Sequence, residues 1–240
     1  MESKKNYWLY GKHNCLAVLK NQNRLIKKIL VTKPNQPLVP SAFINKTEIM
    51  ESKKLMATLK IHDAVTQGVA VLTKPLKQPA LDDFINIKKV KQLVVILDQI
   101  LDPQNIGGVF RSAAAFSVDA VITTTDHSLQ ETPSLTKAAA GTFELIPFIH
   151  VVNLAQSIGV LKNNGFWMIG LDSKIDNYIN TFNASSYDKI ALVLGSEEKG
   201  LRLLTKKHCD FILKISMNQA VESLNVSCAA AIALYQLSVK

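Results

Sequence analysis

The chain has 240 residues, 48% of them apolar, and a formal net charge of +9, so it can form one large or two modest domains with a real core. No apolar run reaches the roughly 18 residues that span a bilayer, and the first residues lack the apolar segment of a secretory signal. Its three widely spaced cysteines suit neither a metal pair nor a disulfide framework, so we expect a cytoplasmic protein with reduced thiols and no membrane partner.

The N-terminal part predicts a small α/β unit. Helical periodicity is found at residues 11–19 and 48–59, and short apolar runs at 28–32 and 69–72 indicate strands. A stretch rich in proline and charge follows, and we expect a linker there with at most a short helix.

The positive charge is concentrated in this part of the chain. Residues 1–92 hold 17 Lys and Arg against 6 Asp and Glu, whereas residues 93–240 hold 11 against 13. A basic segment beside a near-neutral one favours attraction to a polyanion such as RNA. A lysine-rich solvated surface without a partner is the alternative.

From residue 93 strands and helices alternate along the sequence. Strands are expected at 93–97, 120–122, 143–148, 167–170, 190–194 and 211–215, and helices at 106–116, 133–140, 154–163 and 223–237. This alternation predicts an α/β fold with a mostly parallel sheet covered on both faces. We therefore divide the chain into a domain of residues 1–74, a linker of residues 75–92 and a domain of residues 93–240.

Three polar segments, at residues 98–111, 194–201 and 223–227, occur where strands lead into turns or helices. Ligands of open α/β sheets gather outside the carboxyl ends of the strands, so these segments predict one composite site. The spacing of Gly195 and Gly200 is that of a phosphate-binding loop, but Leu201 and Arg202 follow in place of Lys and Ser or Thr. Dehydrogenase, hydrolase and metal signatures are also missing from the sequence.

Several residues of these segments have two interpretations. Adjacent Gly107 and Gly108 each cost a helix about 1 kcal/mol relative to Ala, which indicates either a close approach of a ligand or tight helix–sheet packing. Arg111 lies in an otherwise apolar helix and needs a partner, either a structural carboxylate or a phosphate. Glu197 and Asn225 could simply stabilise helix ends.

The three segments resemble the three motifs of the SpoU (TrmH-like) family of the SPOUT superfamily, which are S-adenosylmethionine-dependent RNA ribose 2′-O-methyltransferases. The matching residues are Asp102, Pro103, Asn105, Gly107 and Arg111, then Leu194, Gly195, Glu197, Gly200 and Leu201, and finally Ser223 to Ser227 with Ala229. The resemblance covers residues 93–240. The first third resembles the family's small L30e-like substrate-binding domain, and the whole chain looks closest to the group that methylates a guanosine of 23S rRNA.

The resemblance implies a deep trefoil knot in the C-terminal domain, a homodimer, and S-adenosylmethionine as methyl donor without a metal. The implied catalytic residues are Arg111, Asn105, Glu197, Ser223 and Asn225. The implied cofactor-binding residues are Thr123, Leu194, Gly195, Ile215, Met217 and Leu224.

Two departures from the family pattern concern the cofactor loop and the target. Relatives often have Pro and Gly where this chain has Ser216 and Gln219, and a His where it has Thr66. Because a free guanidinium has a pKa above about 12, we expect Arg111 to anchor a phosphate and orient the hydroxyl rather than act alone as a base.

Three other functions remain open on the sequence. One is a ribose 2′-O-methyltransferase that acts on tRNA or on another rRNA site, which has the same motifs and a different substrate. Another is a catalytically silent RNA-binding factor of ribosome assembly, which the retained motif residues do not favour. The third is an enzyme acting on a small nucleotide, which the basic N-terminal part does not favour.

Overall fold

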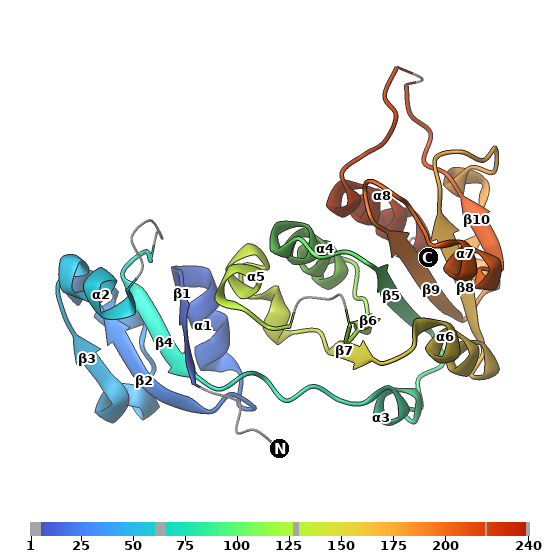
Figure 1. Ribbon diagram of the computed structural model, residues 1–240. Coiled ribbons are helices and arrows are strands. Elements are labelled where there is room, and N and C mark those ends of the chain that lie inside the picture. Colours follow the sequence, from blue (N-terminus) through green and yellow to red (C-terminus); the bar gives the residue numbers. More distant parts are fainter. Residues whose placement is uncertain (1–5, 61–65, 127–129, 219, 239–240) are drawn as a thin grey trace. The chain divides into compact units, whose positions relative to one another are not determined.

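The computed structural model describes residues 6–60, 66–126, 130–218 and 220–238 (Figure 1). The chain forms two compact units. The first contains Met1–Lys77 and Glu131–Leu145, and the second contains Gln78–Gln130 and Ile146–Lys240. The expected division into a domain of residues 1–74, a linker of residues 75–92 and a domain of residues 93–240 remains a prediction.

The elements of the first unit are strands β1 (Tyr7–Tyr10), β2 (Ile26–Val31), β3 (Thr47–Ile49) and β4 (Val69–Thr73), helices α1 (Lys12–Lys20), α2 (Ser52–Leu59) and α5 (Pro133–Ala138), and 3-10 helices η1 (Lys33–Leu38), η2 (Ser41–Lys46) and η3 (Thr142–Glu144). Its sheet has the order β1-β4-β2-β3. Strand β4 is antiparallel to β1 and β2, and β3 is parallel to β2. Ile29 and Val31 share a core cluster with α1, and Leu30 shares one with α2, so the two helices cover opposite faces.

A buried ionic cluster ties residues 131–145 to this unit. The Arg24 side chain is completely buried, and its guanidinium lies 2.6 Å from Glu131 and 2.5 Å from Glu144. The Tyr7 hydroxyl donates a further hydrogen bond to Glu131. Burial raises the pKa of Tyr7, and the negative charge of Glu131 adds to the rise. Because a buried charge is costly without partners, Arg24 holds these distant carboxylates in place.

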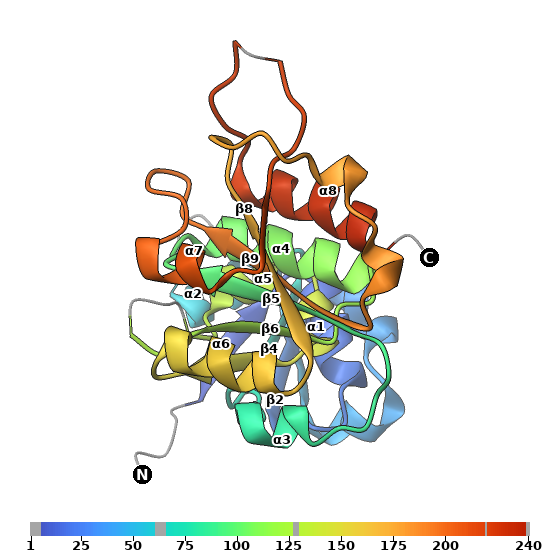
Figure 2. The same ribbon diagram turned by 90° about the vertical axis from the view of Figure 1, so that its right-hand side faces the viewer.

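The second unit contains strands β5 (Gln92–Asp98), β6 (Ala120–Thr124), β7 (Phe148–Val151), β8 (Phe166–Leu171), β9 (Lys189–Gly195) and β10 (Phe211–Leu213), helices α3 (Leu81–Ile85), α4 (Pro103–Ala115), α6 (Leu154–Asn163), α7 (Leu203–His208) and α8 (Val226–Ser238), and 3-10 helices η4 (Ile179–Thr181) and η5 (Ala184–Ser186). All strand pairs of its sheet, ordered β10-β8-β9-β5-β6-β7, are parallel. Helices α4 and α8 cover one face, and α3 and α6 cover the other (Figure 2). The parallel α/β sheet predicted for this part is confirmed.

Some expected elements differ from the structure. The sequence predicts a strand at 143–148, but residues 142–144 form η3 and β7 begins only at Phe148. The helix expected at 48–59 begins only at Ser52, because β3 occupies Thr47–Ile49. The short elements β1 and α7 are not predicted, because four to six residues carry little periodic signal, whereas α3 is the short helix allowed in the linker. Among the described residues, the structure has no helix of the length and apolar character that a membrane crossing requires.

Candidate active site

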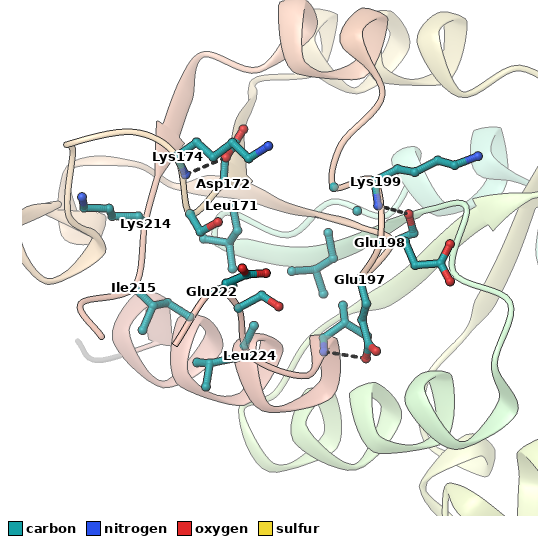
Figure 3. A pocket seen from close by; sticks show the side chains of 18 of the residues that line it. Leu171, Asp172, Lys174, Glu197, Glu198, Lys199, Lys214, Ile215, Glu222 and Leu224 are labelled. Atoms are coloured by element: carbon teal, nitrogen blue, oxygen red, sulfur yellow. Dashed lines mark hydrogen bonds between the residues drawn. The ribbon is translucent and has the colours of Figure 1, made fainter. Parts of the chain in front are cut away.

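A cavity of about 330 Å³ opens at the carboxyl ends of β8, β9 and β10 (Figure 3). Leu171 ends β8, Gly195 ends β9, and Ile215 follows β10, so three neighbouring parallel strands each bring residues to it. Leu224 and the first turn of α8 line the opposite side. The order of the strands explains this convergence, since β9 lies between β8 and β5, and β8 pairs with β10.

Five of the six residues expected at the cofactor line this cavity, namely Leu194, Gly195, Ile215, Met217 and Leu224. Thr123 does not. It lies on β6, is 1% exposed, and donates a hydrogen bond from its hydroxyl to the Leu97 carbonyl at 3.5 Å. Of the two departures in the cofactor loop, Ser216 is exposed and Gln219 lies outside the described residues. The cofactor roles of all six remain predictions.

The turn after β9 closes tightly on itself. A Cβ atom added at Gly195 would lie 2.2 Å from the carbonyl carbon of Gly200 and 2.3 Å from the Leu201 nitrogen. Gly200 has a φ of +66° and donates a backbone hydrogen bond to Ser196 at 2.8 Å. Only glycine fits at position 195, because the clash would be with backbone that cannot turn away.

Glu197 joins the three polar segments. Its Oε1 accepts hydrogen bonds from Asn105 Nδ2 at 3.0 Å, Asn225 Nδ2 at 2.7 Å and the Val226 amide at 3.1 Å. Asn225 also donates to Asn105 Oδ1 at 2.8 Å. The carboxylate thereby satisfies an amide at the start of α8, where negative charge is favourable. The structure thus brings Glu197, Asn105 and Asn225 together, with Ser223 on the cavity wall.

Arg111 lies elsewhere on α4. Its side chain is exposed, does not line the cavity, and makes no hydrogen bond or ion pair with any residue that the structure describes. Arg111 therefore has no carboxylate partner within the described part of the chain, and a structural ion pair does not explain it. The guanidinium is available for a phosphate.

Gly108 has a different reason to be glycine from those considered on the sequence. A Cβ atom added there would lie 2.6 Å from the Ser227 Cβ. The close approach is that of α8, so this glycine serves helix–helix packing. It brings the first motif and the third into contact.

Sequence reasoning missed the charged rim of the cavity, which consists of Asp172, Lys174, Lys214 and Glu222 (Figure 3). Asp172 directly follows β8, and that position at a strand end is the signal that could have found it. Burial would raise the pKa of Asp172, but hydrogen bonds from Lys206 and the Lys174 amide outweigh it and hold this pKa below its usual value. The rim therefore has fixed charges of both signs.

A second polar pair supports the same edge of the sheet. Asp98, which ends β5, is completely buried, and its Oδ1 accepts a hydrogen bond from Arg202 Nε at 2.6 Å. The Arg202 amide donates to Oδ2 at 3.2 Å. Within the described residues, no group of three His, Cys, Asp or Glu side chains could hold a metal ion.

Comparison with known proteins identifies the family. The model of the SpoU rRNA Methylase family matches residues 92–235. A 23S rRNA (guanosine-2′-O-)-methyltransferase of Coxiella burnetii is 34% identical over 236 residues, covering 95% of this chain and 94% of the relative. The chain belongs to the SpoU rRNA methylase family.

Other members agree with this placement along the whole chain. A relative of the same name from Vibrio vulnificus is 33% identical over 238 residues, which cover 96% of this chain and 96% of the relative. An AdoMet-bound rRNA methyltransferase from Sinorhizobium meliloti has a TM-score of 0.80 at 20% identity, covering 97% of this chain and 86% of that one. The resemblance seen in the three motifs is confirmed, and the likeness of fold to the Sinorhizobium meliloti structure covers 97% of the chain.

Proposed function

We propose that this protein transfers a methyl group from S-adenosylmethionine to a ribose 2′-hydroxyl of RNA, and that its substrate is a guanosine of 23S rRNA. The observation that carries the proposal is the convergence of the three SpoU motifs on one cavity through Glu197. The names of the relatives that match almost the entire chain support the choice of 23S rRNA.

The cavity suits the proposed cofactor. Its volume of about 330 Å³ lies at the lower end of the range of small-molecule sites. Leu171, Ile215 and Leu224 offer apolar surface for the flat adenine ring. Carboxylates and lysines at the rim can meet the charged amino and carboxyl groups of its methionine part. The bound cofactor supplies an activated methyl group on a sulfonium, which is already a good leaving group.

The protein must then align the acceptor and assist removal of its proton. Correct alignment alone can be worth about 7–11 kcal/mol of the barrier. We assign Arg111 to the phosphate beside the target ribose, because its guanidinium is exposed and unpaired among the described residues. Ser223 and Glu197 line the cavity, and Asn105 and Glu197 hold Asn225 in place beside the lining residue Leu224.

The first unit is proposed to bind the RNA. Its two segments, Met1–Lys77 and Glu131–Leu145, hold 15 Lys and Arg against 6 Asp and Glu, a net charge of +9. The second unit holds 13 of each, a net charge of zero. Since the surplus charge is confined to the first unit, we expect that unit to provide most of the salt-dependent attraction to phosphate.

Three further properties are proposed from family membership: a homodimer, a trefoil knot in the second unit, and a cytoplasmic location. The dimer has some support on α8, where Ile232 is 42% exposed and Tyr235 is 61% exposed. Apolar surface of this kind is typical of a helix that packs against a partner. Sedimentation of the purified protein at micromolar concentration tests the dimer directly.

The function is tested by transfer of labelled methyl from S-adenosylmethionine to unmodified 23S rRNA and, separately, to tRNA, followed by mapping of the product. One ribose-methylated guanosine in 23S rRNA, lost in Arg111→Ala and retained in Lys207→Ala, is the expected result. Lys207 is an exposed residue of α7 away from the cavity and serves as the matched control. Methylated tRNA alone would overturn the substrate, and cofactor binding without any transfer would favour the silent assembly factor.

The role of Arg111 is tested by the pH–rate profile of Arg111→Lys. A guanidinium that grips a phosphate with two donors is not replaced by an ammonium, so we expect transfer to fall at every pH. Near-wild-type activity with an unshifted profile would contradict any special role of the guanidinium.

A further inference from the structure

The first unit contains a groove of about 880 Å³ between the segment after β2, the start of α2 and the turn before β4. From its contacts we infer that this groove binds an unpaired nucleotide of the RNA substrate. The inference rests on the proposed function, since it assumes that the protein binds RNA. The groove lies entirely within one unit, so it is a second site apart from the cavity at β9.

The floor of the groove is apolar and partly open. Met50 is 9% exposed, Met56 is half-buried, and Ile49 is 49% exposed, so part of this apolar surface faces solvent. Pro34 adds a further apolar face. Methionine, isoleucine and proline side chains suit the flat face of a base, whereas a phosphate would gain nothing from them.

Two amide side chains at the edge have fixed orientations. Asn35 uses both hydrogens of its Nδ2, donating to Thr32 Oγ1 and to the Gln67 carbonyl, each at 3.0 Å. Gln67 Oε1 accepts the Lys12 amide at 2.8 Å. Turning either amide over would lose these bonds. The remaining amide atoms, Asn35 Oδ1 and Gln67 Nε2, form no hydrogen bond with residues that the structure describes. They leave one acceptor and one donor for the edge of a base.

The backbone holds these two amides together. Gln67 has a φ of +52°, and Gly68 follows with a φ of +74°. A Cβ atom added at Gly68 would lie 2.4 Å from Thr32 Oγ1 and 2.5 Å from Asn35 Nδ2. The turn is therefore seated directly on the segment after β2. Strained backbone of this kind persists where the surroundings fix it, and a fixed donor–acceptor pair lowers the cost of binding.

The charge around the groove favours RNA as the occupant. Lys33 lines it, and Lys53 and Lys54 are exposed on α2, whose residues 52 and 56 also line it. Glu51 is the single acid among the described lining residues. Lysines at the rim would meet the phosphates on either side of a base that lies on the apolar floor. Proteins that bind single-stranded RNA combine positive charge along the backbone with side chains that contact the faces of the bases, and in this groove aliphatic side chains take the place of the usual aromatic ones.

The test compares two exposed isoleucines of the same unit in the full-length protein. Ile49→Gln removes the apolar floor at the groove, and Ile44→Gln is the matched control, since Ile44 is 64% exposed on η2 outside the groove. We expect Ile49→Gln to weaken binding of unmodified 23S rRNA by about five-fold or more, and Ile44→Gln by less than about two-fold. Thermal unfolding should be the same for both variants and the wild type.

The salt dependence separates base contacts from phosphate contacts. Ile49→Gln should leave the slope of log K against log salt unchanged, whereas Lys33→Ala should reduce it by about one. Ultraviolet crosslinking should attach nucleotides to peptides that contain residues 34–35 or 49–56. If the two isoleucine variants bound RNA equally well, or if crosslinks in this unit avoided both peptides, the groove would not be a nucleotide site. Methyl transfer by the wild type would still uphold the proposed function in that case. A wild type that neither binds nor methylates RNA would instead overturn the proposed function.

Discussion

Asn105 donates a hydrogen bond from Nδ2 to Glu197 Oε1 at 3.0 Å, across 92 residues of sequence. The same oxygen accepts Asn225 Nδ2 and the Val226 amide. One carboxylate oxygen therefore fixes the start of α4, the turn after β9 and the start of α8 relative to one another. We regard Glu197 as a positioning residue, because its contacts are with the protein's own motifs.

Two substitutions of Glu197 should distinguish the contribution of its hydrogen bonds from that of its negative charge. Glu197→Ala removes three hydrogen bonds at a site that water can reach, and water can replace the lost acceptor, so we expect it to lower the free energy of unfolding by about 0.5–1.5 kcal/mol. Glu197→Gln retains an oxygen at the same place and should cost less. Chemical denaturation of both variants measures this. Glu198→Gln, a change at the exposed neighbouring carboxylate, is the stability control. A Glu197→Ala variant as stable as the wild type would contradict the positioning role.

Two glycines of the second unit should respond to alanine in opposite ways. Gly195→Ala places a Cβ against the backbone of Gly200, so we expect a loss of about 1–3 kcal/mol in the free energy of unfolding and weaker cofactor binding. Gly159 lies inside α6 with nothing within 4 Å of an added Cβ. Gly159→Ala should stabilise the protein by about 0.5–1 kcal/mol. Denaturation and calorimetric titration with S-adenosylmethionine check both, and equal effects would refute the argument.

The buried cluster around Arg24 should dominate the stability of the first unit. Arg24→Ala leaves Glu131 and Glu144 buried without a cation, which we expect to cost about 3–5 kcal/mol. Lys28→Ala breaks an ion pair with Glu48 whose two side chains are 47% and 43% exposed, and should leave the free energy of unfolding almost unchanged. Unfolding by denaturant gives the comparison. Similar losses in both variants would show that the cluster does not stabilise the fold.

Alkaline pH should destabilise the protein through Cys209. Burial raises the pKa of this thiol to about 12, and the negative charge of Asp210 adds to the rise. An unfolded cysteine has a pKa of about 8.5. Between these values the unfolded chain has released a proton that the native state retains, so the free energy of unfolding falls as pH rises through this window.

Cys209→Ala should flatten that alkaline decline. Denaturation at pH 7 and at pH 10 measures it, and Cys228→Ala controls for the loss of an exposed thiol. Parallel declines in the wild type and Cys209→Ala would assign the alkaline sensitivity to other groups.

The sequence by itself determined the architecture of the second unit and the meeting of its three polar segments at one edge of the sheet. Apolar runs such as 93–97 and 190–194 are buried strands because both faces of a parallel sheet are covered, and this signal is local. The polar segments could be assigned to one edge for the same reason, since parallel strands all end on one side. Short elements such as β3 could not be predicted, because three residues are too few to show a hydrophobic periodicity.

Only the tertiary structure decided which distant groups meet. Residues 131–145 pack with the first unit because Arg24 is buried and its charge needs carboxylates more than 100 residues away. Position 108 requires glycine because Ser227 of another helix approaches it closely. Thr123 does not line the cavity because β6 is not beside β9 in the sheet. Periodicity reports which face of an element is buried, but the partner on that face depends on strand order and on long-range pairing.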